Sequence, residues 1–196
     1  MTERSPRYLR QHLARLVVTL AALSVLTGCS FKTVAVRTVA NSLAGSGDLF
    51  SSDEDPELVR DAVPFALKTY ESLLQTVPRH RALLVATCSG FTQYSYAFVQ
   101  AEADAVEPKD HEEAMRLRDR ALKLYLRGNR YCLRALDTRF PGIEQRLLQD
   151  PIPALARAGK ADVPLLYWTG ASWGAAIARC WPSWRSACCS SRMCRG

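Results

Sequence analysis

Four of the seven cysteines lie in the last eighteen residues of the chain, with two tryptophans and four arginines but no acidic residue. Thiolates bind zinc or pair as disulfides, so residues 179–196 are the first place to look for chemistry. A zinc site favours spacings such as Cys-x2-Cys, whereas Cys180, Cys188, Cys189 and Cys194 are 8, 1 and 5 residues apart with no histidine nearby. We therefore interpret residues 179–196 as a non-native tail, as a shifted reading frame produces. A disulfide cluster and a metal site are the alternatives.

Other reactive side chains are scattered along the chain. Cys88 and Cys132 fall on apolar helical stretches, where buried small hydrophobic side chains are the simplest interpretation. His80 and His111 stand at predicted helix starts, without partners at metal-ligand spacing. No phosphate loop, nucleophile elbow or dinucleotide-binding motif occurs in the sequence. We therefore predict that the protein is not an enzyme, and that it has no cofactor and no metal.

The cysteine with the clearest predicted chemistry is Cys29. An arginine-rich stretch, residues 1–15, precedes an uncharged run of 13 residues, 16–28, which is too short for a bilayer span of about 20 residues and suits a signal peptide. Leu26-Thr27-Gly28-Cys29 then resembles a bacterial lipobox. We predict a signal peptide over residues 1–28 and, over residues 29–55, an acylated cysteine and linker.

The residue after the lipobox bears on localisation. Ser30 stands where an aspartate would favour inner-membrane retention, so we expect a lipid anchor on the periplasmic face of the bacterial outer membrane. A short uncleaved anchor helix is the alternative to a lipid anchor.

Net charge argues against nucleic acid as a partner. Residues 1–28 carry +3 and residues 179–196 carry +4, which together account for the whole formal charge of +7. Residues 29–178 hold 18 basic and 18 acidic side chains and are neutral overall. The high pI thus comes from the two ends, and no basic footprint for DNA or RNA is left.

The elements that would position any site are helices. Asp55 and Pro56 form a helix-start signal, and apolar residues recur from there to Val77 at spacings of three and four. We expect Pro64 to kink this first helix. Its predicted apolar face consists of Leu58, Ala62, Phe65, Ala66, Thr69 and Leu73.

Further helices are predicted over residues 80–105, 111–140 and 163–178, with short helical pieces over 143–159. Gly128-Asn129 tolerates a turn and could split the helix over 111–140. Because no alternating strand pattern occurs, we predict an all-α fold over residues 56–178. Its antiparallel helix pairs would resemble tetratricopeptide (TPR) repeats in an incomplete helical solenoid, although no clean 34-residue repeat is present.

Aromatic side chains are the best candidates for a binding site. Tyr94, Tyr96 and Phe98 lie in the second helix, and Trp168 and Trp173 lie in the last. Core packing is the default interpretation of such residues. Lining a cleft for a hydrophobic ligand is the alternative, because apolar pockets with a few phenolic hydroxyls suit such ligands.

Three stretches carry a family resemblance: SGFTQYSYAFVQAEAD (89–104), LYLRGNRYCLRALD (124–137) and VPLLYWTGASWGAAIA (163–178). They resemble the T component of TRAP transporters, the TatT family. The resemblance implies a bacterial lipoprotein of TPR-like helix pairs that assists a tripartite ATP-independent periplasmic transport system. It further implies a homotrimer, a hydrophobic cleft and a periplasmic solute-binding protein as partner.

The resemblance stops near residue 178, where family members continue with further helices. We therefore expect the chain to be truncated or frameshifted there. Two alternatives to a transport accessory stay open, namely a structural TPR-like scaffold in envelope assembly and a non-functional truncated product.

Overall fold

The computed structural model describes residues 15–16, 32–45 and 52–180. Residues 32–44 are helical, and all regular elements in the described ranges are helices, which confirms the all-α prediction. The elements that follow are α3 (Pro56–Thr76), α4 (Arg81–Tyr94), the π-helix η1 (Ser95–Gln100), α5 (Ala101–Val106), α6 (His111–Arg139), α7 (Ile143–Gln149), α8 (Pro151–Leu155), the 3-10 turn η2 (Lys160–Asp162) and α9 (Val163–Cys180). The lipobox with Cys29, and the tail from residue 181 onward, lie outside the described residues.

The helix α3 begins where the sequence predicts. The Asp55 carboxylate accepts hydrogen bonds from the backbone N–H groups of Glu57 and Leu58, each 3.0 Å long. Pro56 occupies the first helical position, where its missing N–H costs nothing. α3 continues through Pro64 and ends at Thr76, one residue before the predicted end.

The buried face of α3 differs from the predicted one. Phe65 and Leu58 are 79% and 59% exposed. The core-facing residues are Val59, Val63, Leu67, Tyr70 and Leu74. This set also repeats at spacings of three and four, so α3 carries two apolar stripes. Packing against α4 and the helix over residues 32–44 determines which stripe is buried.

The predicted second helix is a continuous run of α4, η1 and α5, and a short turn over residues 107–110 leads into α6. The suggested split of α6 at Gly128-Asn129 is wrong, because α6 is unbroken from His111 to Arg139. Gly128 does not form a turn; it permits the close approach of α6 to α4. A Cβ placed there would lie 3.1 Å from the Cys88 carbonyl oxygen and from the Phe91 Cβ.

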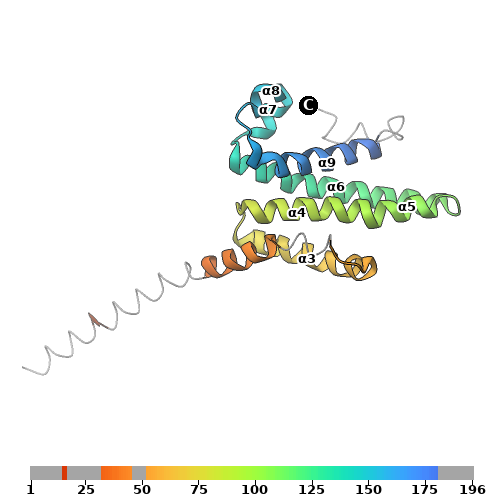
Figure 1. Ribbon diagram of the computed structural model, residues 1–196, viewed down its shortest axis with the longest axis horizontal. Helices are drawn as coiled ribbons and strands as arrows, with labels where there is room; N and C mark the ends of the chain where they lie inside the picture. The colour runs from red at the N-terminus through yellow and green to blue at the C-terminus, as the bar shows by residue number, and fades with distance from the viewer. Residues whose placement is uncertain (1–14, 17–31, 46–51, 181–196) are drawn as a thin grey trace, which may run out of the picture.

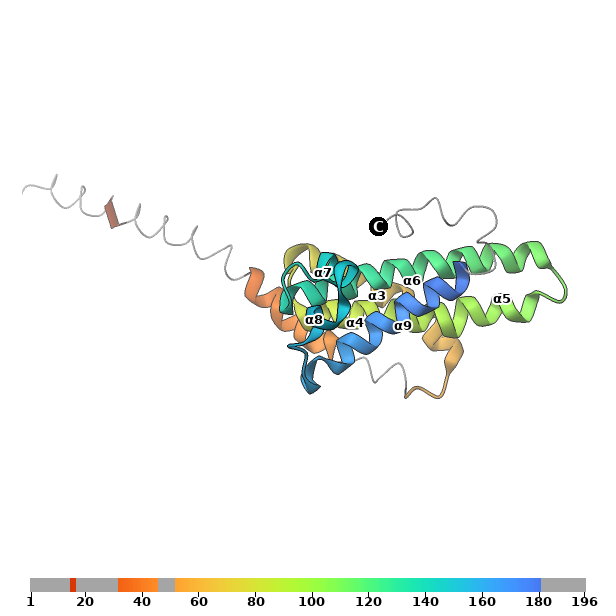
Figure 2. The same ribbon diagram turned by 90° about the horizontal axis from the view of Figure 1, so that it is seen from above.

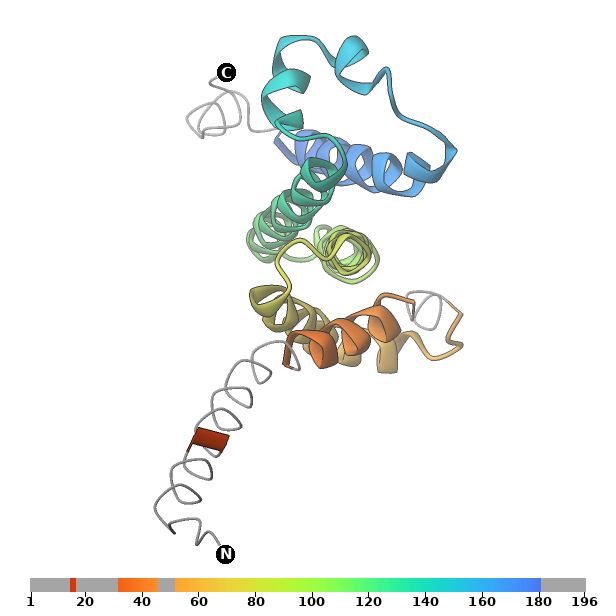
Figure 3. The same cartoon turned by 90° about the vertical axis from the view of Figure 1, so that its left-hand side faces the viewer.

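The helices stack in layers. The helix over residues 32–44 and α3 form one outer layer, followed by α4–α5, then α6, and α9 covers the far side of α6 (Figure 3). α7 and α8 correspond to the short helical pieces predicted over residues 143–159, and they lie beside the end of α6 (Figure 1). Helices in neighbouring layers run antiparallel, and the hydrophobic core lies between the layers. Antiparallel pairing of this kind is compatible with TPR-like repeats, and that assignment stays a prediction.

Candidate functional site

A pocket of about 200 Å³ opens between α3 and the α4–η1 run. Its lining is apolar or small except for a few polar groups. The lining residues are Val59, Val63, Ala66, Leu67, Tyr70, Ala86, Ser89, Gly90, Gln93, Tyr94, Ala97 and Phe98. The buried stripe of α3 forms one wall, so the residues that pack α3 on α4 also shape the pocket.

Small residues on α4 bring the two walls together. A Cβ on Gly90 would lie 2.7 Å from Cδ2 of Leu67, so glycine permits the contact between α3 and α4. Ala86 lies one turn before Gly90, and Ala97 lies two turns after it. These short side chains leave space that larger ones would fill, which produces a pocket next to a close helix contact.

The π-helix η1 supplies one end of the pocket. Its wider turn begins at Ser95, whose buried hydroxyl donates a 2.7 Å hydrogen bond to the Phe91 carbonyl oxygen. The rings of Tyr94 and Phe98 lie 5.5 Å apart between centroids, tilted by 49°. π-helical turns occur often at functional sites because they redirect side chains within a helix. Neither the periodicity nor the capping residues of the sequence indicate this turn.

Polar groups in the pocket are few. The Tyr94 side chain is mostly buried, and its hydroxyl has no hydrogen-bond partner within the described part of the chain. The Tyr70 hydroxyl donates to the Leu43 carbonyl oxygen at 3.2 Å, which ties the helix over residues 32–44 to α3. Gln93 lies exposed at the pocket, with its amide accessible. The arrangement suits an apolar molecule with one hydrogen-bonding group.

The five aromatic residues singled out in the sequence do not come together. Tyr94 and Phe98 line the pocket. Tyr96 is 67% exposed and is not part of the lining. Trp168 and Trp173 are half-buried residues of α9. The helix α9 lies on the opposite side of the helix stack from α3 (Figure 3). The small residues of α4 and the buried stripe of α3 make most of the pocket, and the sequence did not identify them as site residues.

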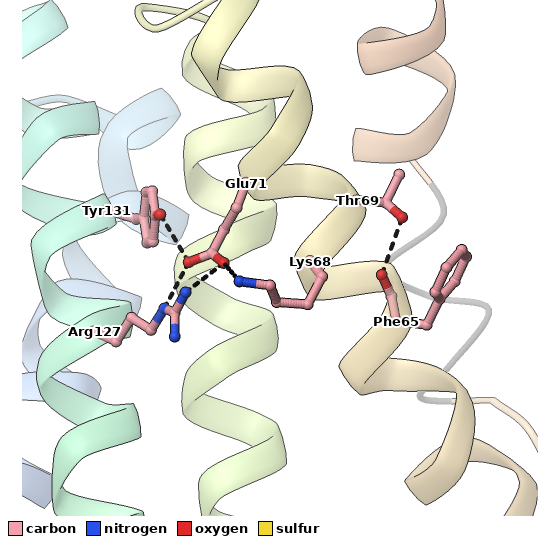
Figure 4. A network of polar contacts seen from close by, with 6 residues as sticks. All are labelled: Phe65, Lys68, Thr69, Glu71, Arg127 and Tyr131. Atoms are coloured by element: carbon pink, nitrogen blue, oxygen red, sulfur yellow. Dashed lines mark hydrogen bonds and ion pairs between the residues drawn. The ribbon is translucent and has the colours of Figure 1, made fainter.

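Outside the lining of this pocket, Glu71 joins α3 to α6 through a polar network (Figure 4). Arg127 donates two hydrogen bonds to its carboxylate, of 2.6 and 2.5 Å, and the Tyr131 hydroxyl donates one of 2.8 Å. Lys68 adds a fourth donor at 3.0 Å. Burial raises the pKa of Glu71, but the hydrogen bonds from Arg127, Lys68 and Tyr131 outweigh it, so that the net pKa lies below 4.5.

Cys88 and Cys132 form a disulfide between α4 and α6. Their predicted burial is confirmed, since both are fully buried. The interpretation of these cysteines as free thiols that act only as small hydrophobic side chains is wrong, because their two sulfur atoms are bonded to each other. Their separation of 44 residues gives no hint of the pairing, which results from the crossing of α4 and α6.

Over residues 15–16, 32–45 and 52–180, no helix is both long and apolar enough to cross a bilayer. The same residues contain no group of three or more histidine, cysteine or acidic side chains placed to hold a metal ion.

Comparisons with known proteins place this architecture. An uncharacterized protein of Treponema pallidum (strain Nichols) is 34% identical over an alignment of 180 residues, and the match covers 81% of this chain and 54% of that protein. The chain thus spans about half the length of this relative. Residues 52–186 match the family described as TRAP transporter T-component, a range that includes the whole helical stack from α3 to α9. This range is more than half of the chain, and the chain therefore belongs to the TRAP transporter T-component family.

Proposed function

We propose that this protein is a lipid-anchored periplasmic accessory component of a TRAP-type transport system, and that its pocket between α3 and α4 binds a hydrophobic ligand. The pocket carries the ligand proposal. It combines an apolar lining with the hydroxyl of Tyr94, which lacks a partner among the described residues. This hydroxyl can exchange a hydrogen bond with a polar group of a ligand whose apolar part contacts the rest of the lining.

Two features support the periplasmic location. The Leu26-Thr27-Gly28-Cys29 sequence suits processing and acylation of a lipoprotein. The disulfide between Cys88 and Cys132 suits an oxidising compartment, because disulfides persist there and are rare in the reducing cytosol. The outer membrane is the proposed destination, since Ser30 follows the acylated residue.

Membership of the family supports the proposals for a protein partner and an assembly state. We propose that the protein acts through protein contacts, with a periplasmic solute-binding protein as its partner. A homotrimer is the proposed assembly. Size-exclusion chromatography with light scattering tests the trimer, and a pull-down tests the partner; recovery of envelope-assembly proteins alone would contradict the transport role.

The ligand proposal is tested with a fluorescent long-chain fatty acid as the apolar probe. We expect saturable binding to the purified full chain. Ala97→Trp places an indole at the pocket from an exposed helical position and reduces the affinity at least about tenfold, or about 1.4 kcal/mol. Ala105→Trp is the matched control, because Ala105 is also exposed on a helix but does not line the pocket. Equal affinity of the two variants contradicts the site.

The anchor is tested separately. Inhibition of lipoprotein signal peptidase should leave a precursor 28 residues longer than the mature chain, and Cys29→Ser should give no acylated product by mass spectrometry. A chain of unchanged mobility under inhibition contradicts a lipid anchor at Cys29.

A further inference from the structure

Charge is segregated along the helix stack, although the sequence between the two termini is neutral. One set of segments, residues 32–45, 67–81 and 123–162, carries thirteen basic and five acidic side chains, a net of +8. We call it the basic end. A second set, residues 52–66 and 101–120, carries five basic and twelve acidic side chains, a net of −7, and we call it the acidic end.

These segments gather at opposite ends because neighbouring helices run antiparallel. α3 ends, α4 begins, α6 ends and α9 begins at the end of the stack where the helix over residues 32–44 begins (Figures 1 and 2). The start of α3 and the turn between α5 and α6 lie at the other end (Figure 2). An ion pair of 2.5 Å between Arg60 and Glu102 joins α3 to α5 there.

At the basic end, arginines from three segments surround Pro78, in the turn between α3 and α4. Arg37 and Arg79 line one groove, together with Thr33. Arg79 also lines the adjoining groove with Arg130 and Arg134. Arg134 donates a 3.0 Å hydrogen bond to the Pro78 carbonyl oxygen, which holds the end of α6 against this turn.

Three of these arginines are available to bind an anion. Arg37, Arg79 and Arg130 are exposed, and none has an ion pair or side-chain hydrogen bond with another described residue. A guanidinium presents planar donors that match the oxygens of phosphate, and several together give a strong site for phosphate-bearing surfaces. The basic end therefore offers free phosphate-binding groups on one contiguous surface.

The position of the proposed lipid anchor indicates which phosphate-bearing surface the basic end would bind. Lys32 follows Cys29 by three residues, a distance of at most about 11 Å in extended chain. An acyl chain on Cys29 would thus hold the basic end, and not the acidic end, at the bilayer surface. We propose that the basic end binds the anionic headgroups of the membrane that holds the lipid anchor, through Arg37, Arg79 and Arg130. This inference rests on the proposed lipid anchor.

Salt screens the repulsion between the acidic end and an anionic bilayer more than the attraction of the basic end, which lies nearer to the surface. α6 has 29 residues and spans about 43 Å, so the acidic end lies several Debye lengths from the surface at physiological salt, where that length is about 8 Å. The helix stack would stand away from the bilayer with the acidic end outward.

Arginine footprinting of the lipidated full chain tests the contact. The protein is reconstituted in vesicles of phosphatidylcholine, with or without roughly 30 mol% phosphatidylglycerol, and its modification by phenylglyoxal is followed by mass spectrometry. We expect Arg37 and Arg130 to react at least about threefold more slowly on the anionic vesicles, because about a fivefold change in affinity accompanies each basic residue near an anionic surface. Arg120, exposed at the acidic end, should react equally on both. The protection should disappear in about 1 M NaCl, where the Debye length is about 3 Å.

A charge-reversal pair provides the matched control. Arg79→Glu combined with Arg130→Glu should abolish the protection of Arg37. Lys109→Glu combined with Arg120→Glu changes the net charge equally at the acidic end and should leave that protection intact.

Equal reactivity on the two vesicle types overturns the inference, as does protection that survives high salt. Protection that occurs only after a purified solute-binding protein is added also overturns it, in favour of an acidic protein surface. The intact mass of the reconstituted protein reports acylation separately. A missing acyl chain contradicts the anchor, whereas an acylated chain with unprotected arginines contradicts the headgroup contact.

Discussion

Gly128 of α6 lies directly against Cys88 of α4, and a Cβ at position 128 would be 3.1 Å from the Cys88 carbonyl oxygen. The same Cβ would lie 3.2 Å from the Thr92 hydroxyl oxygen. The Cys88–Cys132 disulfide joins the two helices one turn further along α6. Glycine at 128 is therefore required by the distance between α4 and α6, and not by a turn.

Gly128→Val should destabilise the protein strongly. The added carbons meet a backbone oxygen and a buried side chain that cannot move away without separating α4 from α6. We expect a loss of about 2–3 kcal/mol in the free energy of unfolding, typical of overpacking. Urea denaturation followed by circular dichroism measures it. Gly170→Val is the matched control, since a Cβ added at this position of α9 would meet no atom within 4 Å. It should change stability by less than about 0.5 kcal/mol. A similar loss in both variants would contradict the close approach of α4 and α6 as the cause.

Glu71→Gln should reveal a pH-dependent link between α3 and α6. The glutamate pKa is lower in the folded protein than its ordinary 4.5, so its carboxylate stabilises the fold above that pH. This contribution is lost as the pH falls through the lowered folded pKa. Near pH 7 we expect the substitution to cost about 1–2 kcal/mol, because Arg127 loses its charged partner.

The measurement is the free energy of unfolding of both proteins between about pH 3 and 7. The difference between wild type and Glu71→Gln should shrink toward acid. Glu112→Gln serves as the control, because Glu112 is 87% exposed in its ion pair with Arg116 and should contribute less than about 0.5 kcal/mol. A difference for Glu71→Gln that is constant over the whole range would mean that the carboxylate charge plays no part.

How far the sequence predicts this fold differs from helix to helix. The starts of α3 and α9 could be predicted because local signals, such as Asp55 before Pro56, act within one turn. The buried face of α3 could not be predicted, because Leu58 and Phe65 belong to one apolar stripe and Val59 and Val63 to another. Periodicity identifies stripes, and only the neighbouring helices select between them.

The candidate site depends even more on long-range packing. Tyr94 and Phe98 could be proposed from their spacing, but Leu67 and Gly90 meet only once α3 lies on α4. The charge segregation is invisible in a linear count, since residues 29–178 sum to zero. It results from the antiparallel order of the helices, which brings separate basic segments to one end.

Cys132→Ser should destabilise the protein under oxidising conditions. The disulfide closes a loop with a sequence separation of 44 residues, and loss of that constraint on the unfolded chain costs about 4 kcal/mol in the loop-entropy estimate. Denaturant unfolding of the two proteins, with and without dithiothreitol, measures the effect. With reductant, the free energy of unfolding of the wild type should fall to within about 1 kcal/mol of that of the variant. Both proteins then lack the disulfide and differ only by a thiol in place of a hydroxyl. Ser89→Ala, a half-buried position beside Cys88, controls for local disturbance of α4 and should respond to reductant as the wild type does. A wild type that is insensitive to reductant, with free thiols at both positions by alkylation, would contradict the disulfide itself.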